Sequence, residues 1–271
     1  MKLISICPSN TELAVYLGLK DNLVALDDFS DWPEELCQLP RLGPDLSINM
    51  DLLETYKPDL VLASLSVPGM EKNVEALKNR NIPHIVFDPQ TFQDIAENLQ
   101  TLGDIIGKRK ETTLAIETFN NTLETYRNIA ATIHQPKTVY FEWWPNPIFT
   151  PGKINWLTEL SQLAGARNIF DDVQLASVQT TWEDVVSRNP EHICLSWVGV
   201  KQSRMKREHV LKRKDASDLQ AVQNGQIHLL EESLFCRPSP RLLVGLQKLS
   251  YLLHPDYFPA SHPIESNKTK S

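Results

Sequence analysis

The side chains that most often perform catalysis or bind metals are scattered along this sequence. None of the seven histidines, at positions 84, 134, 192, 209, 228, 254 and 262, stands beside an acid at metal-ligand spacing. The chain has no nucleophile-elbow, zinc-protease, P-loop or dinucleotide-binding motif. Its four cysteines (7, 37, 194 and 236) form neither a zinc pattern nor a disulfide framework. We therefore expect no catalytic residues, no metal site and no cofactor.

Aromatic side chains that follow predicted strands are the stronger chemical signal. In a parallel sheet, ligands lie beyond the carboxyl ends of the strands. Aromatic rings at those ends predict a cleft with flat apolar walls, suited to a large planar ligand. The alternative is that the rings pack between two lobes of the protein. The five residues are Phe29, Trp32, Trp143, Trp144 and Trp197.

Short apolar runs alternate with helical patterns along most of the chain, which predicts an α/β fold with mainly parallel sheets. The two halves also resemble each other. In each, a short helix, a proline–acid turn and an apolar strand follow one another, at Lys57-Pro58-Asp59 and at Asn189-Pro190-Glu191. The expected strands cover residues 3–7, 23–26, 60–63, 85–87, 138–141, 193–197 and 227–230. The expected helices include residues 9–18, 50–56, 71–79, 155–163 and 181–187, and one that follows Ser239-Pro240.

The longest helical pattern runs from about Asp104 to His134. Its apolar residues recur at alternating steps of three and four, the period of one helix face, and Pro136 ends the pattern. We interpret it as a connector between two lobes; the alternative is a long helix within a single domain. The predicted organisation is an N-terminal α/β lobe (1–103), a connecting backbone helix (104–135), a C-terminal α/β lobe (136–259) and a disordered tail (260–271).

Two local patterns give further predictions. Ser9 and Glu12 have the spacing of a capping box at a helix start, and that junction is also a place to hold a polar ligand group. The basic run from Lys201 to Lys214 is typical of a solvated helix face.

The charge balance is acidic, with a net charge of −7 and a pI of about 5.5, which favours neither nucleic acid nor an anionic membrane as partner. No apolar run approaches the roughly 20 residues of a membrane span. The sequence as written shows no signal peptide, which predicts a cytoplasmic protein. An extracytoplasmic location is expected if a signal was removed.

Several ordered motifs carry a family resemblance. The opening run from Ile4 to Glu12, the loop from Asp28 to Pro33, the run from Lys57 to Ala63 and the segment from Arg237 to Arg241 resemble the helical-backbone (class III) substrate-binding proteins of ABC importers, in particular the cobalamin-binding branch. The resemblance covers roughly residues 2–255. Siderophore and haem receptors share this architecture.

The resemblance implies two Rossmann-like lobes joined by one long helix, with the ligand in a cleft between them. By position, the ligand-binding residues would be Phe29, Trp32, Ser64, Leu65, Trp143, Trp144, Trp197 and Arg237. Ser64-Leu65 replaces a tryptophan often found after that strand. Glu71 and Glu183 fall where family members dock onto a membrane permease, although an acid in the first turn of a helix is also favoured by the helix dipole.

The resulting hypothesis is a monomeric, non-catalytic binder of cobalamin or a related corrinoid that serves an ABC permease, with no protein side chain on the cobalt. One alternative is a haem or ferric-siderophore receptor; a siderophore site would need a basic cluster, for which only Arg237 and Arg241 are candidates. Another is an intracellular corrinoid binder without a transporter. An enzyme would need a titratable group such as Glu142, and an interaction protein would fill the cleft with its own side chains.

Overall fold

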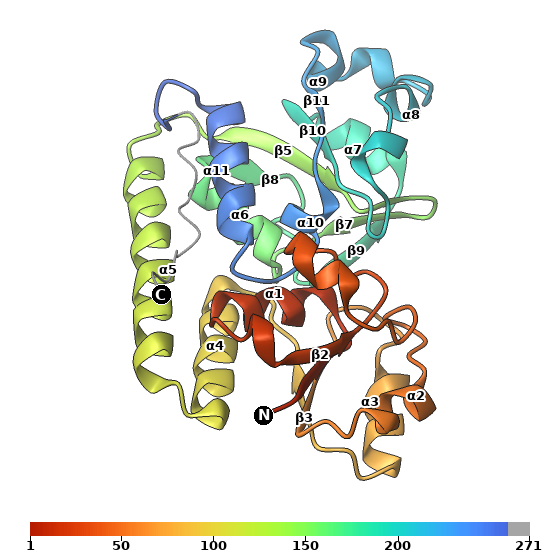
Figure 1. The fold of residues 1–271 in the computed structure, drawn as a ribbon. Helices are drawn as coiled ribbons and strands as arrows, with labels where there is room; N and C mark the ends of the chain where they lie inside the picture. Colours follow the sequence, from red (N-terminus) through yellow and green to blue (C-terminus); the bar gives the residue numbers. More distant parts are fainter. Residues whose placement is uncertain (260–271) are drawn as a thin grey trace. The chain divides into compact units, whose positions relative to one another are not determined.

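The structure, a computed structural model, describes residues 1–259, which form two compact units. Unit 1 comprises residues 1–120 and the short segment Arg237–Pro240, and unit 2 comprises residues 121–236 and 241–259. Figure 1 follows the elements along the chain by colour. The predicted disorder of residues 260–271 lies outside the described residues.

Unit 1 contains a four-stranded parallel sheet with the strand order β2-β1-β3-β4. The strands are β1 (Leu3–Ser5), β2 (Leu23–Leu26), β3 (Leu60–Ser64) and β4 (His84–Phe87). The helices are α1 (Pro8–Tyr16), α2 (Met50–Thr55), α3 (Glu71–Asn79) and α4 (Phe92–Ile106), with the 3₁₀ turns η1 (Lys20–Asn22) and η2 (Glu34–Gln38).

Both faces of this sheet are covered. Successive residues of a strand point to opposite faces, and successive residues of β1 and β3 enter different hydrophobic clusters. Burial on two sides explains why these strands are continuous apolar runs in the sequence. One cluster takes Leu3, Leu60 and Leu62, and the other takes Ile4, Val61 and Ala63.

Unit 2 combines a parallel sheet of order β11-β10-β5-β8 with a small antiparallel sheet of order β6-β7-β9. The parallel strands are β5 (Lys137–Glu142), β8 (Ala166–Asn168), β10 (His192–Leu195) and β11 (Ile227–Leu229). The antiparallel strands are β6 (Trp144–Pro145), β7 (Ile148–Pro151) and β9 (Ser177–Thr180). The helices are α6 (Trp156–Leu163), α7 (Trp182–Arg188), α8 (Glu208–Leu211), α9 (Gln220–Gln223), α10 (Glu232–Phe235) and α11 (Leu242–Leu253), with 3₁₀ turns η3 (Gln202–Arg204) and η4 (Ala216–Asp218).

The predicted fold class, α/β with parallel sheets in two lobes, is confirmed. The antiparallel sheet was not expected. Its strands are short, and Pro145 at the end of β6 and Pro147 in the connection to β7 give this stretch the composition of a turn.

The long helix α5 (Arg109–Ala130) runs from unit 1 into unit 2 and is shorter than the pattern predicted. Gly107, with φ of +73°, ends α4 in the left-handed conformation that favours glycine, so a new helix begins after it. Asp104 therefore belongs to α4. No helix within residues 1–259 has the length and apolar composition that crossing a bilayer requires.

The basic run from Lys201 to Lys214 is not one solvated helix face, so that prediction was wrong. Only η3 and the four-residue α8 are helical there. Met205 and Val210 are buried in the core of unit 2, and the half-buried Arg213 pairs with an internal carboxylate. The apolar residues of this run are spaced irregularly, so the chain forms short turns that bury Met205 and Val210 in the core of unit 2.

Two histidines meet on the parallel sheet of unit 2. His192 begins β10 and His228 lies in β11, and Nδ1 of His192 is 3.1 Å from Nε2 of His228. Their rings stack with centroids 5.3 Å apart. Burial lowers the pKa of each histidine from 6.5 to about 4. Both imidazoles are therefore neutral at pH 7.

This pair predicts a loss of stability in mild acid. Between pH 6.5 and pH 4 the unfolded chain binds protons that the folded histidines do not, so the contribution is complete above pH 6.5 and is lost as the pH falls toward 4. In urea unfolding across this range, the His192→Asn/His228→Asn variant should lose less stability than the native protein.

His134→Asn is the control, because His134 is exposed and lies outside the pair. It should follow the native pH profile. Equal acid sensitivity of the double variant and the native protein would contradict the assignment. Buried Asp27, whose pKa burial raises to about 6, shifts stability in the opposite direction but is present in every variant compared.

Candidate functional site

Four of the five predicted ligand-binding residues of unit 1, all but Arg237, lie at or beyond the ends of the two strands that flank β1. Because the strands are parallel, their carboxyl ends meet at one edge of the sheet. The backbone confirms the junctions: Asp27 N donates to Ser5 O over 3.1 Å, and Ile6 N donates to Leu62 O over 3.1 Å. The segment after β2, with Phe29 and Trp32, and the end of β3, with Ser64 as its last residue and Leu65 directly after it, therefore lie at the same edge of the sheet.

The segment Asp27–Pro33, named here the aromatic loop, is anchored by the buried side chain of Asp27. Its Oδ1 accepts hydrogen bonds from Phe29 N (2.7 Å) and Ser30 N (3.0 Å), and its Oδ2 accepts one from Ser30 Oγ (2.5 Å). An aspartate at a turn start commonly closes the turn in this way. The loop backbone is held while the ring of Phe29 stays 44% exposed.

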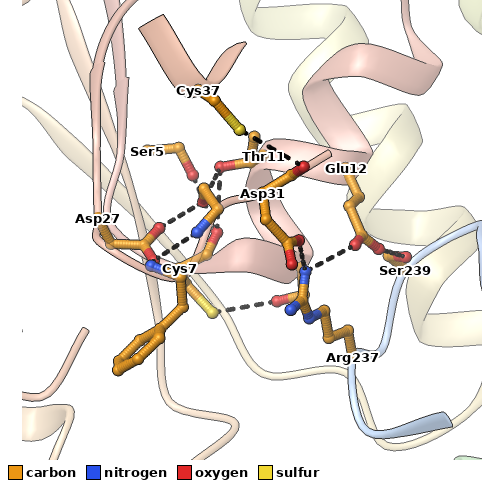
Figure 2. Close-up of polar contacts among 12 residues, drawn as sticks. Ser5, Cys7, Thr11, Glu12, Asp27, Asp31, Cys37, Arg237 and Ser239 are labelled. Carbon is orange, nitrogen blue, oxygen red and sulfur yellow. Dashed lines mark hydrogen bonds and ion pairs between the residues drawn. The ribbon is translucent and has the colours of Figure 1, made fainter. Parts of the chain in front are cut away.

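Two more side chains hold the aromatic loop. Thr11 Oγ1 of α1 lies 2.7 Å from Ser30 Oγ. The Arg41 guanidinium donates to the carbonyl oxygens of Asp27 (2.7 Å) and Ser30 (2.8 Å). Figure 2 shows part of this network beside α1. Side chains from outside the loop therefore fix its first half.

Glu12 of α1 is buried and does not form the predicted capping box with Ser9. Cys7 is the N-cap of α1 and makes no side-chain capping bond. Ser9 Oγ instead lies 3.2 Å from Cys7 Sγ, and Glu12 accepts from Arg237 Nη1 (3.3 Å) and Ser239 Oγ (2.5 Å). Glu12 thus binds a segment that is distant in the sequence, whereas the local pattern had predicted that it caps the start of its own helix.

Arg237, which the resemblance placed on the ligand, lies in this buried cluster. Its Nη1 donates to Asp31 Oδ1 of the aromatic loop over 2.6 Å, in addition to Glu12 (Figure 2). The residue is 8% exposed. Its charge is balanced by two carboxylates within unit 1, which argues against a basic cluster for an anionic siderophore.

Ser64 and Leu65 lie at the same sheet edge but have internal roles. Ser64 is buried, and its Oγ accepts from Ser66 N over 3.1 Å. Leu65 N donates to Phe87 O over 3.0 Å, and its side chain packs against a core cluster of unit 1. A ligand role for either residue stays a prediction.

In unit 2 the aromatic residues gather at the carboxyl ends of β5 and β10. These strands are neighbours, with Leu195 opposite Glu142. Beyond the last pair, Val198 N donates to Trp143 O over 3.1 Å, so the segments that carry Trp143 and Trp197 run side by side. The structure thus brings these predicted residues together within unit 2.

Exposure separates the three tryptophans. Trp144 is 43% exposed, and its Nε1 donates to Asn146 O over 3.2 Å. Trp143 is buried against Trp156, with ring centroids 5.6 Å apart, and Trp197 is also buried. Trp144 is the one of the three that offers an open ring face, while Trp143 and Trp197 support the segments around it.

Glu142, the acid suggested for an enzyme, is fully buried and surrounded by donors. Arg213 donates to both carboxylate oxygens, over 2.5 and 2.8 Å, in a bidentate pair. Tyr140 OH (2.9 Å) and Trp197 Nε1 (3.2 Å) donate to it as well. A carboxylate with four donors has a structural role and is not a free general base.

Sequence reasoning missed Arg213 and His209. His209 is exposed in the short α8, and its ring centroid lies 5.0 Å from that of Trp197. Both residues lie in the basic run, and no local pattern links them to β5 or β10. Among residues 1–259 no group of three or more histidine, cysteine or acidic side chains is placed to hold a metal ion.

The two glutamates predicted to dock a permease both lie in the first turn of a helix. Glu71 begins α3, and its Oε2 accepts from Gly69 N over 2.7 Å. Glu183 is exposed in the first turn of α7, where hydrogen bonds from its own backbone N–H and from Thr181 lower its pKa. Their equivalent positions fit both docking and simple helix-end stabilisation.

Comparison with known proteins decides the family. The sequence profile described as "Periplasmic binding protein" matches residues 3–234. The chain belongs to this family. Proteins of the periplasmic binding protein family bind substrates for ABC transporters without catalysis, so the prediction that the chain is not an enzyme is confirmed.

Curated relatives match almost the whole chain. An uncharacterized ABC transporter substrate-binding lipoprotein of Bacillus subtilis, YvrC, is 30% identical over 262 residues, which is 95% of this chain and 81% of the relative. A vitamin B12-binding protein of Vibrio cholerae is 30% identical over 250 residues, which is 92% of this chain and 87% of the relative.

Solved structures agree on the fold. The periplasmic vitamin B12 binding protein BtuF of Vibrio cholerae has a TM-score of 0.77 at 27% identity. The superposed residues cover 93% of this chain and 96% of the BtuF chain. A periplasmic heme binding protein of Pseudomonas aeruginosa has a TM-score of 0.83 at 20% identity, with coverage of 97% and 95%. At that identity the second likeness shows the fold alone.

The buried pair in unit 2 predicts a large effect of a single substitution. Arg213→Met leaves the Glu142 carboxylate buried without its main partner and should lower the free energy of unfolding by about 3 kcal/mol. Glu142→Gln/Arg213→Met removes both charges and should recover part of that loss. Urea unfolding measures both variants.

Arg127→Met is the control, because Arg127 and Glu124 form an exposed pair one helical turn apart. Exposed pairs contribute about 0–1 kcal/mol, so this variant should remain near the native value. An Arg213→Met protein as stable as the control would show that the buried pair does not hold this part of unit 2 together.

Proposed function

We propose that this protein binds cobalamin or a closely related corrinoid and delivers it to an ABC permease. The observation that carries the proposal is the 30% identity to vitamin B12-binding proteins over 92% of the chain. The match spans both units, including both segments that expose aromatic rings.

The exposed rings support a large ligand with apolar faces. Phe29 of unit 1 and Trp144 of unit 2 each follow the carboxyl end of a parallel strand, and each keeps more than two fifths of its surface exposed. Aromatic rings supply much contact area at little conformational cost. We propose that Phe29, Trp32 and Trp144 contact the corrin ring.

The charge of the aromatic loop favours a ligand without acidic groups. Asp28 and Asp31 are exposed on either side of Phe29, and the positive charge of Arg237 is shared between Asp31 and Glu12. A corrin carries neutral amide side chains, whereas haem carries propionates that such a loop would repel. This supports a corrinoid over haem.

One observation favours haem as a second candidate. His209 is exposed beside Trp197, and a neutral imidazole is a common axial ligand of haem iron. Haem binding through His209 should produce a Soret band that shifts or disappears in His209→Ala. The corrinoid proposal expects no such band and no effect of this substitution on cobalamin affinity, since no side chain is proposed on the cobalt.

Calorimetric titration of the purified protein with cobalamin tests the proposal. We expect one site per chain with micromolar or tighter affinity. Phe29→Ala and Trp144→Ala should each weaken binding at least about tenfold, or roughly 1.4 kcal/mol, because each removes a large contact surface.

Tyr251→Ala is a matched control, because Tyr251 of α11 is also 43% exposed. Its affinity should equal that of the native protein. A native protein that binds neither cobalamin nor cobinamide would refute the proposal. Undiminished affinity in both aromatic variants would refute the proposed contacts.

We further propose that Glu71 and Glu183 dock the protein onto its permease, in an extracytoplasmic location like that of the lipoprotein and periplasmic relatives. Glu71→Lys/Glu183→Lys should keep cobalamin affinity but abolish uptake in cells that express the protein with the ABC permease of its own organism.

Glu75→Lys, which alters another exposed glutamate of α3, is the control and should keep both the affinity and the uptake. Normal uptake by the double variant would contradict the docking role, and binding without any coupled uptake would favour an intracellular corrinoid binder.

A further inference from the structure

Arg237–Pro240, named here the strap, is a four-residue piece of the C-terminal part of the chain that belongs to unit 1. The residues on both sides of it belong to unit 2. The chain therefore enters unit 1 at Arg237 and leaves it after Pro240. The strap contains no helix or strand, so its position depends on contacts between its side chains and the rest of unit 1.

Buried polar contacts hold the strap. Arg237 and Ser239 both donate to Glu12, and the three residues are almost completely buried. A carboxylate removed from water is tolerated only when donors surround it. Glu12 therefore fixes the strap, and the strap in turn makes the burial of Glu12 possible.

The strap also reaches the aromatic loop. The ion pair between Arg237 Nη1 and Asp31 Oδ1 is 2.6 Å long, and the Asp31 side chain is 60% exposed (Figure 2). Asp27, Thr11 and Arg41 hold the loop as far as Ser30. The next residue of the loop, Asp31, makes the ion pair with Arg237 and directly precedes Trp32.

We propose that Arg237 is a positioning residue that clamps the second half of the aromatic loop, and that it does not itself contact the ligand. The guanidinium, oriented by Glu12, holds Asp31 and thereby presents Trp32 in the conformation that binds. A loop that is ordered before binding loses less conformational entropy when the ligand arrives. The effect on affinity rests on the proposed function, whereas the clamp itself does not.

Asp31→Asn separates a clamp from a direct ligand contact. It removes the charged partner of Arg237 on the loop and leaves the Arg237–Glu12 pair intact. Because the Asp31 side chain is exposed, the variant should fold like the native protein. Hydrogen exchange of residues 28–37 should become roughly tenfold faster, and cobalamin should bind roughly tenfold more weakly. If Arg237 contacted the ligand, the variant would keep or gain affinity and the exchange would be unchanged, which would overturn the proposal.

A double-mutant cycle adds a second test. Arg237→Gln and Arg237→Gln/Asp31→Asn should bind cobalamin equally weakly, because either change already opens the clamp. Independent, additive losses would overturn the proposal. If Arg237→Gln misfolds because Glu12 is left buried, Glu12→Gln/Arg237→Gln removes both charges and takes its place. Arg237→Lys, which keeps the charge but not the guanidinium geometry, should restore only part of the affinity.

Asp172→Asn is the matched control. Asp172 is also 60% exposed and accepts from an arginine, Arg188, at 2.7 Å, but it lies in unit 2. It should change neither the exchange of residues 28–37 nor the affinity. A native protein that fails to bind cobalamin would refute the proposed function, and the exchange measurement would still decide the clamp.

Discussion

Buried carboxylates organise the segments that carry the exposed aromatic rings. In unit 1, Asp27 closes the start of the aromatic loop and Glu12 orients Arg237 toward its second half. In unit 2, Glu142 binds Arg213 and the indole of Trp197. Each carboxylate lies at or near the carboxyl edge of a parallel sheet. Burying a carboxylate is costly unless donors surround it, so each one dictates where its neighbours must lie.

Because each buried carboxylate needs several donors, the loops around it are held in place while their aromatic rings stay exposed. The donors around the carboxylates are backbone N–H groups, arginines, hydroxyls and an indole, which hold the chain while leaving Phe29 and Trp144 exposed. A receptor for a large rigid ligand benefits from such an arrangement, because loops that are ordered beforehand reduce the entropy lost on binding. Within unit 2, the buried tryptophans Trp143 and Trp197 support the segments around Trp144.

Local patterns predicted the elements well where burial follows a simple period. The two-sided burial of β1 and β3 made them continuous apolar runs, and the leucines of α11 recur at helical spacing and are buried. Prediction failed where a polar residue had two plausible partners. Glu12 had the spacing of a helix cap, yet Arg237 and Ser239 bind it from more than 220 positions away.

The sequence by itself determined the α/β alternation, most strands of the two parallel sheets and the aromatic residues at their carboxyl ends, because those features depend on neighbours within a few positions. The tertiary structure decided which rings stay open and which arginines turn inward. Arg213 lies in a basic run with nothing in its local sequence that distinguishes it from solvated residues, and the family resemblance assigned Arg237 to the ligand, not to a buried carboxylate. Their roles arise because a parallel sheet brings distant segments to one edge, where a buried carboxylate selects the donor that can reach it.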